Sequence, residues 1–128
     1  MLIPDNLFYK KSHEWAEFLP GGLCRVGISD FAQSAMGDIV FVNLPSVGDE
    51  VTADEALCDI ESVKAVSDVF SPVSGTIKQV NDALSDEPQL LNSSPYDAWI
   101  AVIETGDTFD GLMDADAYRQ FCESEENS

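Results

Sequence analysis

One lysine stands out by its neighbours as a group that could carry covalent chemistry. The run Glu61-Ser62-Val63-Lys64-Ala65-Val66-Ser67-Asp68 places Lys64 between two strand-like segments, with small residues beside it and a carboxylate at either end. A lysine at the tip of a hairpin is exposed, and an enzyme can acylate its amine to attach a carboxylic acid as an amide. An ordinary exposed turn lysine is the alternative, and spacing alone does not separate the two.

The only other basic residue between Val26 and Tyr118 is Lys78. It follows Gly75-Thr76-Ile77 within an expected strand and lacks the open flanks of Lys64. We therefore expect Lys64, and not Lys78, to be the modified lysine.

The remaining reactive side chains form no catalytic or metal-binding pattern. The three cysteines are widely spaced without a CxxC pair, and His13 is the only histidine, so we expect no metal site. Cys58 alternates with Ala56 and Ile60, which predicts a small core residue on one strand face. A reducing compartment is the simplest explanation for cysteines that form no disulfide pattern. No nucleophile–base pair or phosphate-binding loop is present, so we do not expect an independent enzyme.

The elements that must position Lys64 are predicted to be short strands separated by turns. Residues 38–44 are nearly continuous in Ile, Val and Phe, which predicts a strand with both faces buried. Expected strands cover residues 23–28, 38–44, 55–61, 67–71, 76–80 and 99–104.

Two helices are also predicted. Ser29 or Asp30 caps a short helix that stops at Gly37, and Asp114 caps a C-terminal helix. The expected inner face of the second helix is Ala115, Ala117, Tyr118 and Phe121. The pattern indicates a mainly β protein, α+β by content, with two packed antiparallel sheets, short helices and a C-terminal helix. We expect one domain over residues 1–128, with a frayed acidic tail from about residue 123.

The net charge restricts the partners. With 24 acidic and 6 basic residues the chain carries −18, which disfavours nucleic acid and anionic membranes. Two explanations of this excess of acidic residues remain open. One is solubility or adaptation to salt, and the other is recognition by basic partner surfaces. No apolar run is long enough to span a membrane, and the N-terminus lacks the basic region of a signal peptide. We expect a cytoplasmic bacterial protein, or a mitochondrial matrix protein if the chain is a processed eukaryotic one.

Several segments resemble a known family. Gly48-Asp49, Ile60 to Ala65 and Ser71 to Gly75 are similar to lipoyl and biotinyl carrier domains, although biotin carriers usually have Met on both sides of the lysine. Further segments narrow the resemblance to glycine cleavage H proteins, over nearly the whole chain and in the correct order. They are Ser12-His13-Glu14-Trp15, Val26 to Asp30 with Ala32-Gln33, Gly37 to Val42, Val80 to Leu84, Asn92 to Tyr96, and Met113 to Ala115 with Ala117-Tyr118.

Two positions depart from the family pattern. Asp54 stands where the family usually has glycine, and aspartate is among the residues that tolerate a left-handed backbone. The run Tyr96-Asp97-Ala98-Trp99 is shorter than the family's usual Tyr-Gly-x-Gly-Trp-like run and lacks its glycine.

The resemblance implies a lipoyl/biotinyl-type barrel-sandwich hybrid that is a non-catalytic carrier, with lipoic acid on Lys64. In the family, glycine decarboxylase (P protein) leaves an aminomethyl group on a lipoyl sulfur. The tetrahydrofolate-dependent aminomethyltransferase (T protein) takes the one-carbon unit, and dihydrolipoamide dehydrogenase (L protein) reoxidises the dithiol. A lipoate ligase or lipoyl transferase is a further implied partner, and we expect the free chain to be a monomer.

The resemblance also implies a cleft for the loaded arm. Ser12, Glu14 and Asp68 occupy positions that lie beside this cleft in the family, where a carboxylate favours the protonated amine and slows ammonia loss. Without the resemblance, Glu14 is a partly exposed, solvated charge and Asp68 a strand-edge charge. His13 is expected to pack or to form hydrogen bonds, and Trp15 to lie in the core.

Two other functions remain open from the sequence. An H-like lipoylated carrier in a lipoyl relay or another redox system would share Lys64 and the fold. An acidic interaction domain with an unmodified Lys64 is the alternative of a different class.

Overall fold

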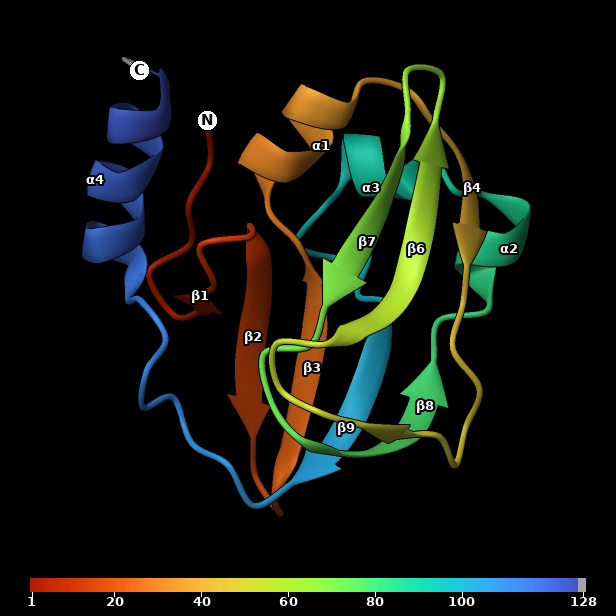
Figure 1. Ribbon diagram of the computed structural model, residues 1–128, viewed down its shortest axis with the longest axis vertical. Coiled ribbons are helices and arrows are strands. Elements are labelled where there is room, and N and C mark those ends of the chain that lie inside the picture. Colours follow the sequence, from red (N-terminus) through yellow and green to blue (C-terminus); the bar gives the residue numbers. More distant parts are fainter. Residues whose placement is uncertain (127–128) are drawn as a thin grey trace.

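Two antiparallel sheets and four helices make up the computed structural model, which describes residues 1–126 (Figure 1). The large sheet has the strand order β1 (Phe8–Tyr9), β2 (Glu14–Leu19), β3 (Leu23–Ile28), β9 (Ala101–Thr105), β8 (Gly75–Val80) and β5 (Glu50–Val51). The small sheet has the order β4 (Ile39–Asn43), β6 (Ala56–Ser62) and β7 (Val66–Phe70). The helices are α1 (Asp30–Met36), α2 (Ala83–Asp86), α3 (Leu90–Ser93) and α4 (Ala115–Glu126). This architecture confirms the predicted fold class.

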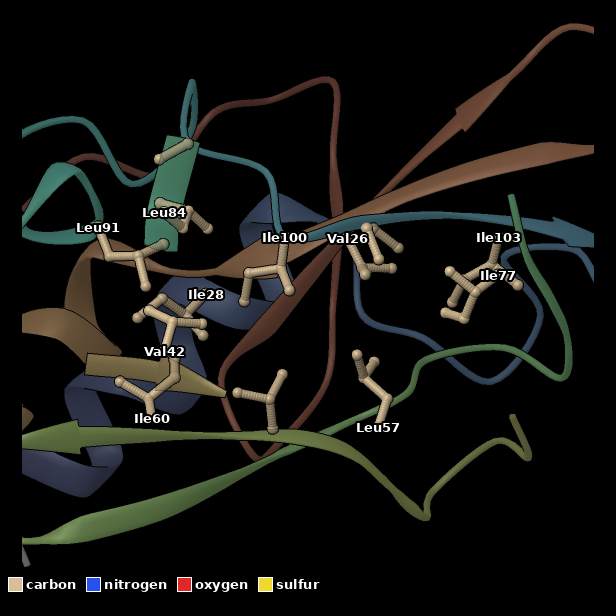
Figure 2. Packing of buried hydrophobic residues seen from close by; sticks show 14 of the residues in the cluster. Val26, Ile28, Val42, Leu57, Ile60, Ile77, Leu84, Leu91, Ile100 and Ile103 are labelled. Carbon is tan, nitrogen blue, oxygen red and sulfur yellow. The ribbon is translucent and has the colours of Figure 1, made fainter. Parts of the chain in front are cut away.

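The core lies between the two sheets (Figure 2). Val26 and Ile100, near the large sheet, face Leu57 and Ile60 of the small sheet, and Leu84 of α2 joins the same cluster. The inner faces of the strands supply this cluster, and bulges interrupt the two-residue period in β4 and β6. Within residues 1–126, no helix is long and apolar enough to cross a membrane.

Helix α1 begins and ends where the sequence predicts. The Ser29 hydroxyl accepts a hydrogen bond from the Ala32 N–H at 3.2 Å, which caps the first turn. Gly37 has a positive φ of 77° and donates its N–H to the Gln33 carbonyl at 3.1 Å. A side chain at this φ would be strained, so glycine ends the helix here.

Helix α4 differs from its prediction in two respects. The Asp114 carboxylate accepts the Ala117 N–H at 2.9 Å, so the predicted cap is confirmed. The buried residues are Ala115, Tyr118 and Cys122, whereas Ala117 is exposed, because the positions that face the sheet follow a spacing of three and four. The helix continues to Glu126, where a frayed tail had been expected from residue 123; residues 127–128 of that tail lie outside the described residues.

The prediction that both faces of β4 are buried is wrong. Ile39 and Val42 are buried, but Val40 and Phe41 are exposed, and the pairing with β6 shifts between Ile39 and Phe41. The small sheet packs its inner face on the core and leaves its outer face to solvent, and the bulge adds one residue to the outer side. Apolar composition does not reveal such a bulge.

A second bulge changes the expected face of β6. The register with β7 shifts between Ala56 and Cys58, so Leu57 and Ile60 are buried while Ala56 is exposed and Cys58 is half-buried. Cys58 still packs against the core together with Ile60, as expected of a small core residue, so only the place of Ala56 in the expected alternation is wrong.

Candidate functional site

Lys64 lies at the tip of the β6–β7 hairpin, which projects at the same end of the molecule as α1 (Figure 1). The Ser62 N–H donates to the Ala65 carbonyl at 2.8 Å, and the Ser62 hydroxyl accepts the N–H groups of Lys64 and Ala65 at 3.3 and 3.2 Å. The Val63 N–H donates to the Asp38 carbonyl at 3.0 Å, which ties the loop to the segment after α1. The backbone of the loop is thus held, while the Lys64 side chain is exposed.

The stem of Lys64 passes over Gly37. A Cβ atom placed on Gly37 would lie 3.3 Å from Lys64 Cε and 3.7 Å from Nζ. Only a residue without a side chain leaves this space free. The stem of the exposed lysine therefore rests against the C-terminal end of α1.

A cleft of about 200 Å³ begins beside this end of α1. Met36, which precedes Gly37, lines it together with the small side chains of Ala32 and Ala35. The other lining residues come from the β2 and β3 region and from β6 and β7, and they are Ser12, His13, Glu14, Ile28, Ile60, Ser67, Asp68 and Val69. The cleft is thus apolar along α1 and the sheets and polar where β2 begins.

Glu14 is the buried charge of this cleft. Its residue is 2% exposed, so the solvated N-terminal charge that was the alternative for Glu14 is not what the structure shows. The Ser12 hydroxyl donates to Glu14 Oε1, and the Phe70 N–H donates to Oε2 at 3.0 Å. Burial raises the pKa of the Glu14 carboxyl, and the hydrogen bonds from Ser12 and Phe70 act in the opposite direction. The Lys10 charge also lowers this pKa but is the smallest of the contributions, and among residues 1–126 no ion pair to Glu14 is present.

The structure brings Ser12, Glu14 and Asp68 together around one cleft, with Lys64 next to it. Ser12 and Asp68 are exposed, and Asp68 lies opposite Asp59 across the β6–β7 pair. Asp68 consequently sits at the exposed edge of the cleft, whereas Glu14 lies inside it.

His13 connects the cleft to α4. Its Nδ1 lies 2.7 Å from the Tyr118 hydroxyl and its Nε2 2.7 Å from a Glu125 carboxylate oxygen, while the Tyr118 hydroxyl lies 2.6 Å from Ser29 Oγ. The imidazole also stacks on Phe31, with ring centroids 4.4 Å apart. His13 thus has the packing and hydrogen-bonding role expected from the sequence.

Trp15 anchors the strand that carries Glu14. It is buried, as predicted, and its Nε1–H donates to the Pro95 carbonyl at 3.1 Å. A Cβ on Gly27, opposite Trp15 in β3, would come within 2.6 Å of the indole ring, so the flat contact requires glycine there.

Asp54 adopts the left-handed backbone that the sequence allowed, with φ of 72°. Its carboxylate pairs with the Lys10 ammonium group. Aspartate at this position thus adopts the backbone conformation for which the family usually has glycine.

Sequence reasoning missed part of the site. The wall formed by Ala32, Ala35 and Met36 was not singled out, although small residues on a short helix were a usable signal. The Phe70 N–H that holds Glu14 is a backbone group and has no sequence signal.

Comparisons with known proteins agree on one family. The family model described as glycine cleavage H-protein matches residues 7–125. A glycine cleavage system H protein from Micrococcus luteus is 52% identical over 91% of this chain and 94% of its own length, and one from Coprothermobacter proteolyticus is 50% identical over 94% and 98%. The crystal structure of a glycine cleavage system H protein from Mycobacterium marinum superposes with a TM-score of 0.88 at 38% identity, covering 94% of this chain and 99% of that one. The chain belongs to the glycine cleavage H-protein family.

Proposed function

We propose that the chain is the lipoyl-lysine carrier of the glycine cleavage system, with lipoic acid attached to Lys64. It passes an aminomethyl group from glycine decarboxylase to the tetrahydrofolate-dependent aminomethyltransferase, and it presents the dithiol to dihydrolipoamide dehydrogenase. The observation that carries the proposal is an exposed lysine whose stem lies beside a cleft with a buried carboxylate.

The surroundings of Lys64 fit covalent attachment. In its neutral form, Nζ attacks the carboxyl carbon of an activated lipoyl donor, the C–N amide bond forms, and the donor's leaving group departs with its electron pair while Nζ loses a proton. The formal net charge then changes from −18 to −18 − 1 = −19. When bound, the lipoyl group supplies a disulfide that can be reduced to a dithiol.

Glu14 supports the protective part of the proposal. A cationic amine that enters the cleft provides the counter-charge that the buried carboxylate lacks, and the carboxylate in turn favours the protonated amine. A protonated amine has no free lone pair with which to expel a sulfur leaving group. The apolar wall of α1 excludes water from the same space and strengthens the pairing of charges.

The chain acts as a carrier and not as an enzyme in this proposal. Its contribution is a tether that keeps the reactive group at high effective concentration near each partner. We further propose a single carrier domain that is monomeric when free and works in the bacterial cytoplasm, or in the mitochondrial matrix if the chain is eukaryotic. A lipoate ligase or lipoyl transferase modifies it.

Intact mass and peptide mapping test the attachment. The wild type, Lys64→Arg and Lys78→Arg are each incubated with lipoate, ATP and a lipoate ligase. We expect one lipoyl mass increment, on the peptide of Lys64, in the wild type and Lys78→Arg, and none in Lys64→Arg. A lipoyl group on Lys78 would overturn the assignment to Lys64, and an unmodified wild type would return the chain to an acidic interaction domain.

Reconstitution separates glycine cleavage from a lipoyl relay. The lipoylated chain is mixed with glycine decarboxylase, and exchange of labelled bicarbonate into glycine is measured. We expect exchange that saturates with the carrier and is absent with Lys64→Arg. A lipoylated chain that supports no exchange but donates its lipoyl group to another acceptor would favour the relay.

A further inference from the structure

The outer face of the small sheet forms an exposed row next to Lys64. Phe41 of β4 and Val66 of β7 both lie opposite Glu61 of β6, so their three side chains project from the same face. Ile60, the neighbour of Glu61, is buried on the inner face. The row therefore faces solvent immediately below the Lys64 loop.

Two exposed apolar side chains flank the half-buried Glu61 in this row. Phe41 is 44% exposed and Val66 62% exposed, and the bulge residue Val40 and the loop residue Val63 are exposed as well. We call these four residues the outer patch. Val63 directly precedes Lys64, so the outer patch is continuous with the modification loop. Exposed apolar residues that gather on one sheet face beside a modification loop are a candidate interaction site.

The border of the outer patch is acidic. The next row across the sheet holds Asn43, Asp59 and Asp68, with Asn43 Nδ2 donating to Asp59 Oδ1 at 2.8 Å. Asp38 lies exposed at the start of β4. With a net charge of −18, a second copy of the chain or an anionic membrane would be repelled. A complementary surface has apolar groups opposite Phe41 and Val66, and lysine or arginine opposite Glu61 and around the border.

The position of the outer patch selects among the proposed partners. Enzymes that act on the dithiolane meet it at the far end of an extended arm. The enzyme that forms the amide must bring its acyl donor to Nζ itself, and so must contact the loop and the surface below it. We propose that the outer patch is the docking surface for the enzyme that attaches the lipoyl group, and that this enzyme contacts it with apolar groups beside basic side chains.

This inference rests on lipoylation at Lys64, and steady-state kinetics of a lipoate ligase with the unmodified chain test it. Phe41→Ser and Val66→Ser remove apolar contacts without changing charge or the acceptor amine. We expect KM for the chain to rise about tenfold for Phe41→Ser and a few-fold for Val66→Ser, with kcat little changed. Higher salt should raise KM for the wild type as well, since the acidic border is screened.

Two matched controls lie elsewhere on the molecule. Val47 is also 62% exposed, but lies in the turn whose Gly48 N–H donates to Ile77 of β8 at 2.8 Å. Phe109 is 53% exposed and stacks on Phe8 of β1 at 4.6 Å. Val47→Ser and Phe109→Ser should leave KM unchanged. Circular dichroism and melting curves of all four variants separate a lost contact from a lost fold.

The outcomes also separate this inference from the proposed function. A wild type that accepts no lipoyl group would overturn the function itself. A wild type that is lipoylated, with folded Phe41→Ser and Val66→Ser variants showing wild-type KM, would overturn only the docking surface. The docking surface would also be overturned if the control variants raised KM as much as the patch variants did.

Discussion

The Lys64 hairpin and the Glu14 cleft adjoin one another, but they are built on opposite physical principles. The hairpin is exposed and is held by its own backbone, the Ser62 hydroxyl and the Asp38 carbonyl. The cleft places a carboxylate where water is excluded and holds it with the Phe70 N–H of the other sheet. The proposed attachment point can therefore change chemically with little cost to the fold, whereas the proposed protective site is expected to reduce stability.

This difference follows from the charge each region must handle. Acylation removes the positive charge of Lys64, and an exposed residue can lose a charge with little effect on folding. In the proposed function Glu14 acts on a bound cation, and a carboxylate is more effective where the local dielectric constant is low. Such a carboxylate is poorly stabilised until the cation arrives.

The largest effect should come from Lys64→Ala, which we expect to abolish carrier activity completely. The free energy of unfolding should change by no more than about 0.5 kcal/mol, because the side chain is exposed. Glycine–bicarbonate exchange and chemical denaturation measure the two quantities. A large fall in stability would show that the stem of Lys64 over Gly37 is structural, and would contradict the contrast between the two regions.

The second effect concerns the lifetime of the aminomethyl-loaded protein. Glu14→Ala should speed ammonia release in the absence of tetrahydrofolate by about tenfold, which corresponds to 1.36 kcal/mol. A partly exposed pair would give only a few-fold change, but Glu14 is buried and its hydrogen bonds are charge-assisted. Ammonia is measured over time at equal pH and salt.

Glu14→Gln is the matched control for shape in this experiment. It keeps the size of the side chain and an oxygen to accept the Phe70 N–H, so faster release in this variant reports the lost charge. Faster release only in Glu14→Ala would point to lost docking of the arm. Equal rates in all three proteins would remove Glu14 from the site.

A third effect is the pH dependence of stability. The pKa of Glu14 is raised in the folded state, chiefly by burial, so the folded protein holds this proton at pH values where the unfolded chain has lost it. The contribution of this group to stability is full below its unfolded pKa and is lost as pH rises through the folded pKa. Glu14→Gln should therefore be more stable than the unmodified wild type at neutral pH, on the order of 1 kcal/mol, with the gap closing in acid. A gap that is constant or widens in acid would contradict the unpaired buried charge.

The smallest effect should follow Ser62→Ala. The loss of the hydroxyl that accepts two N–H groups in an exposed loop should reduce stability by about 0.5 kcal/mol. Lipoylation of Lys64 should remain, with a modest rise in KM from a looser loop. Thermal melting and ligase kinetics check both, and complete loss of lipoylation would mean that the hairpin must be rigid to react.

Local signals in the sequence were sufficient for much of the fold. The caps Ser29 and Asp114 and the stop at Gly37 were predicted because a helix end is decided by a few adjacent residues. The exposure of Phe41 was not predicted, because the bulge that turns it outward depends on pairing with a distant strand.

In the site, too, local features were predicted from the sequence and features that depend on distant residues were not. Lys64 at a hairpin tip is a local feature, and its context in the sequence predicted its exposure. The burial of Glu14 depends on β7 and α1 closing over the start of β2, so the sequence suggested only a partly exposed charge. The contact between Lys64 and Gly37 likewise joins residues that are distant in the chain.

The three cysteines have a consequence for a protein proposed to carry a disulfide on its own surface. Cys24 and Cys122 are buried and Cys58 is half-buried, and burial raises the pKa of the Cys24 and Cys58 thiols to about 12 and also raises that of Cys122. Only the thiolate attacks a disulfide, and at pH 8 a thiol with this pKa is ionised in roughly one molecule in ten thousand. Thiol–disulfide exchange between the chain's own cysteines and a tethered dithiolane is thereby suppressed, so the arm stays available to its partners instead of closing onto its carrier.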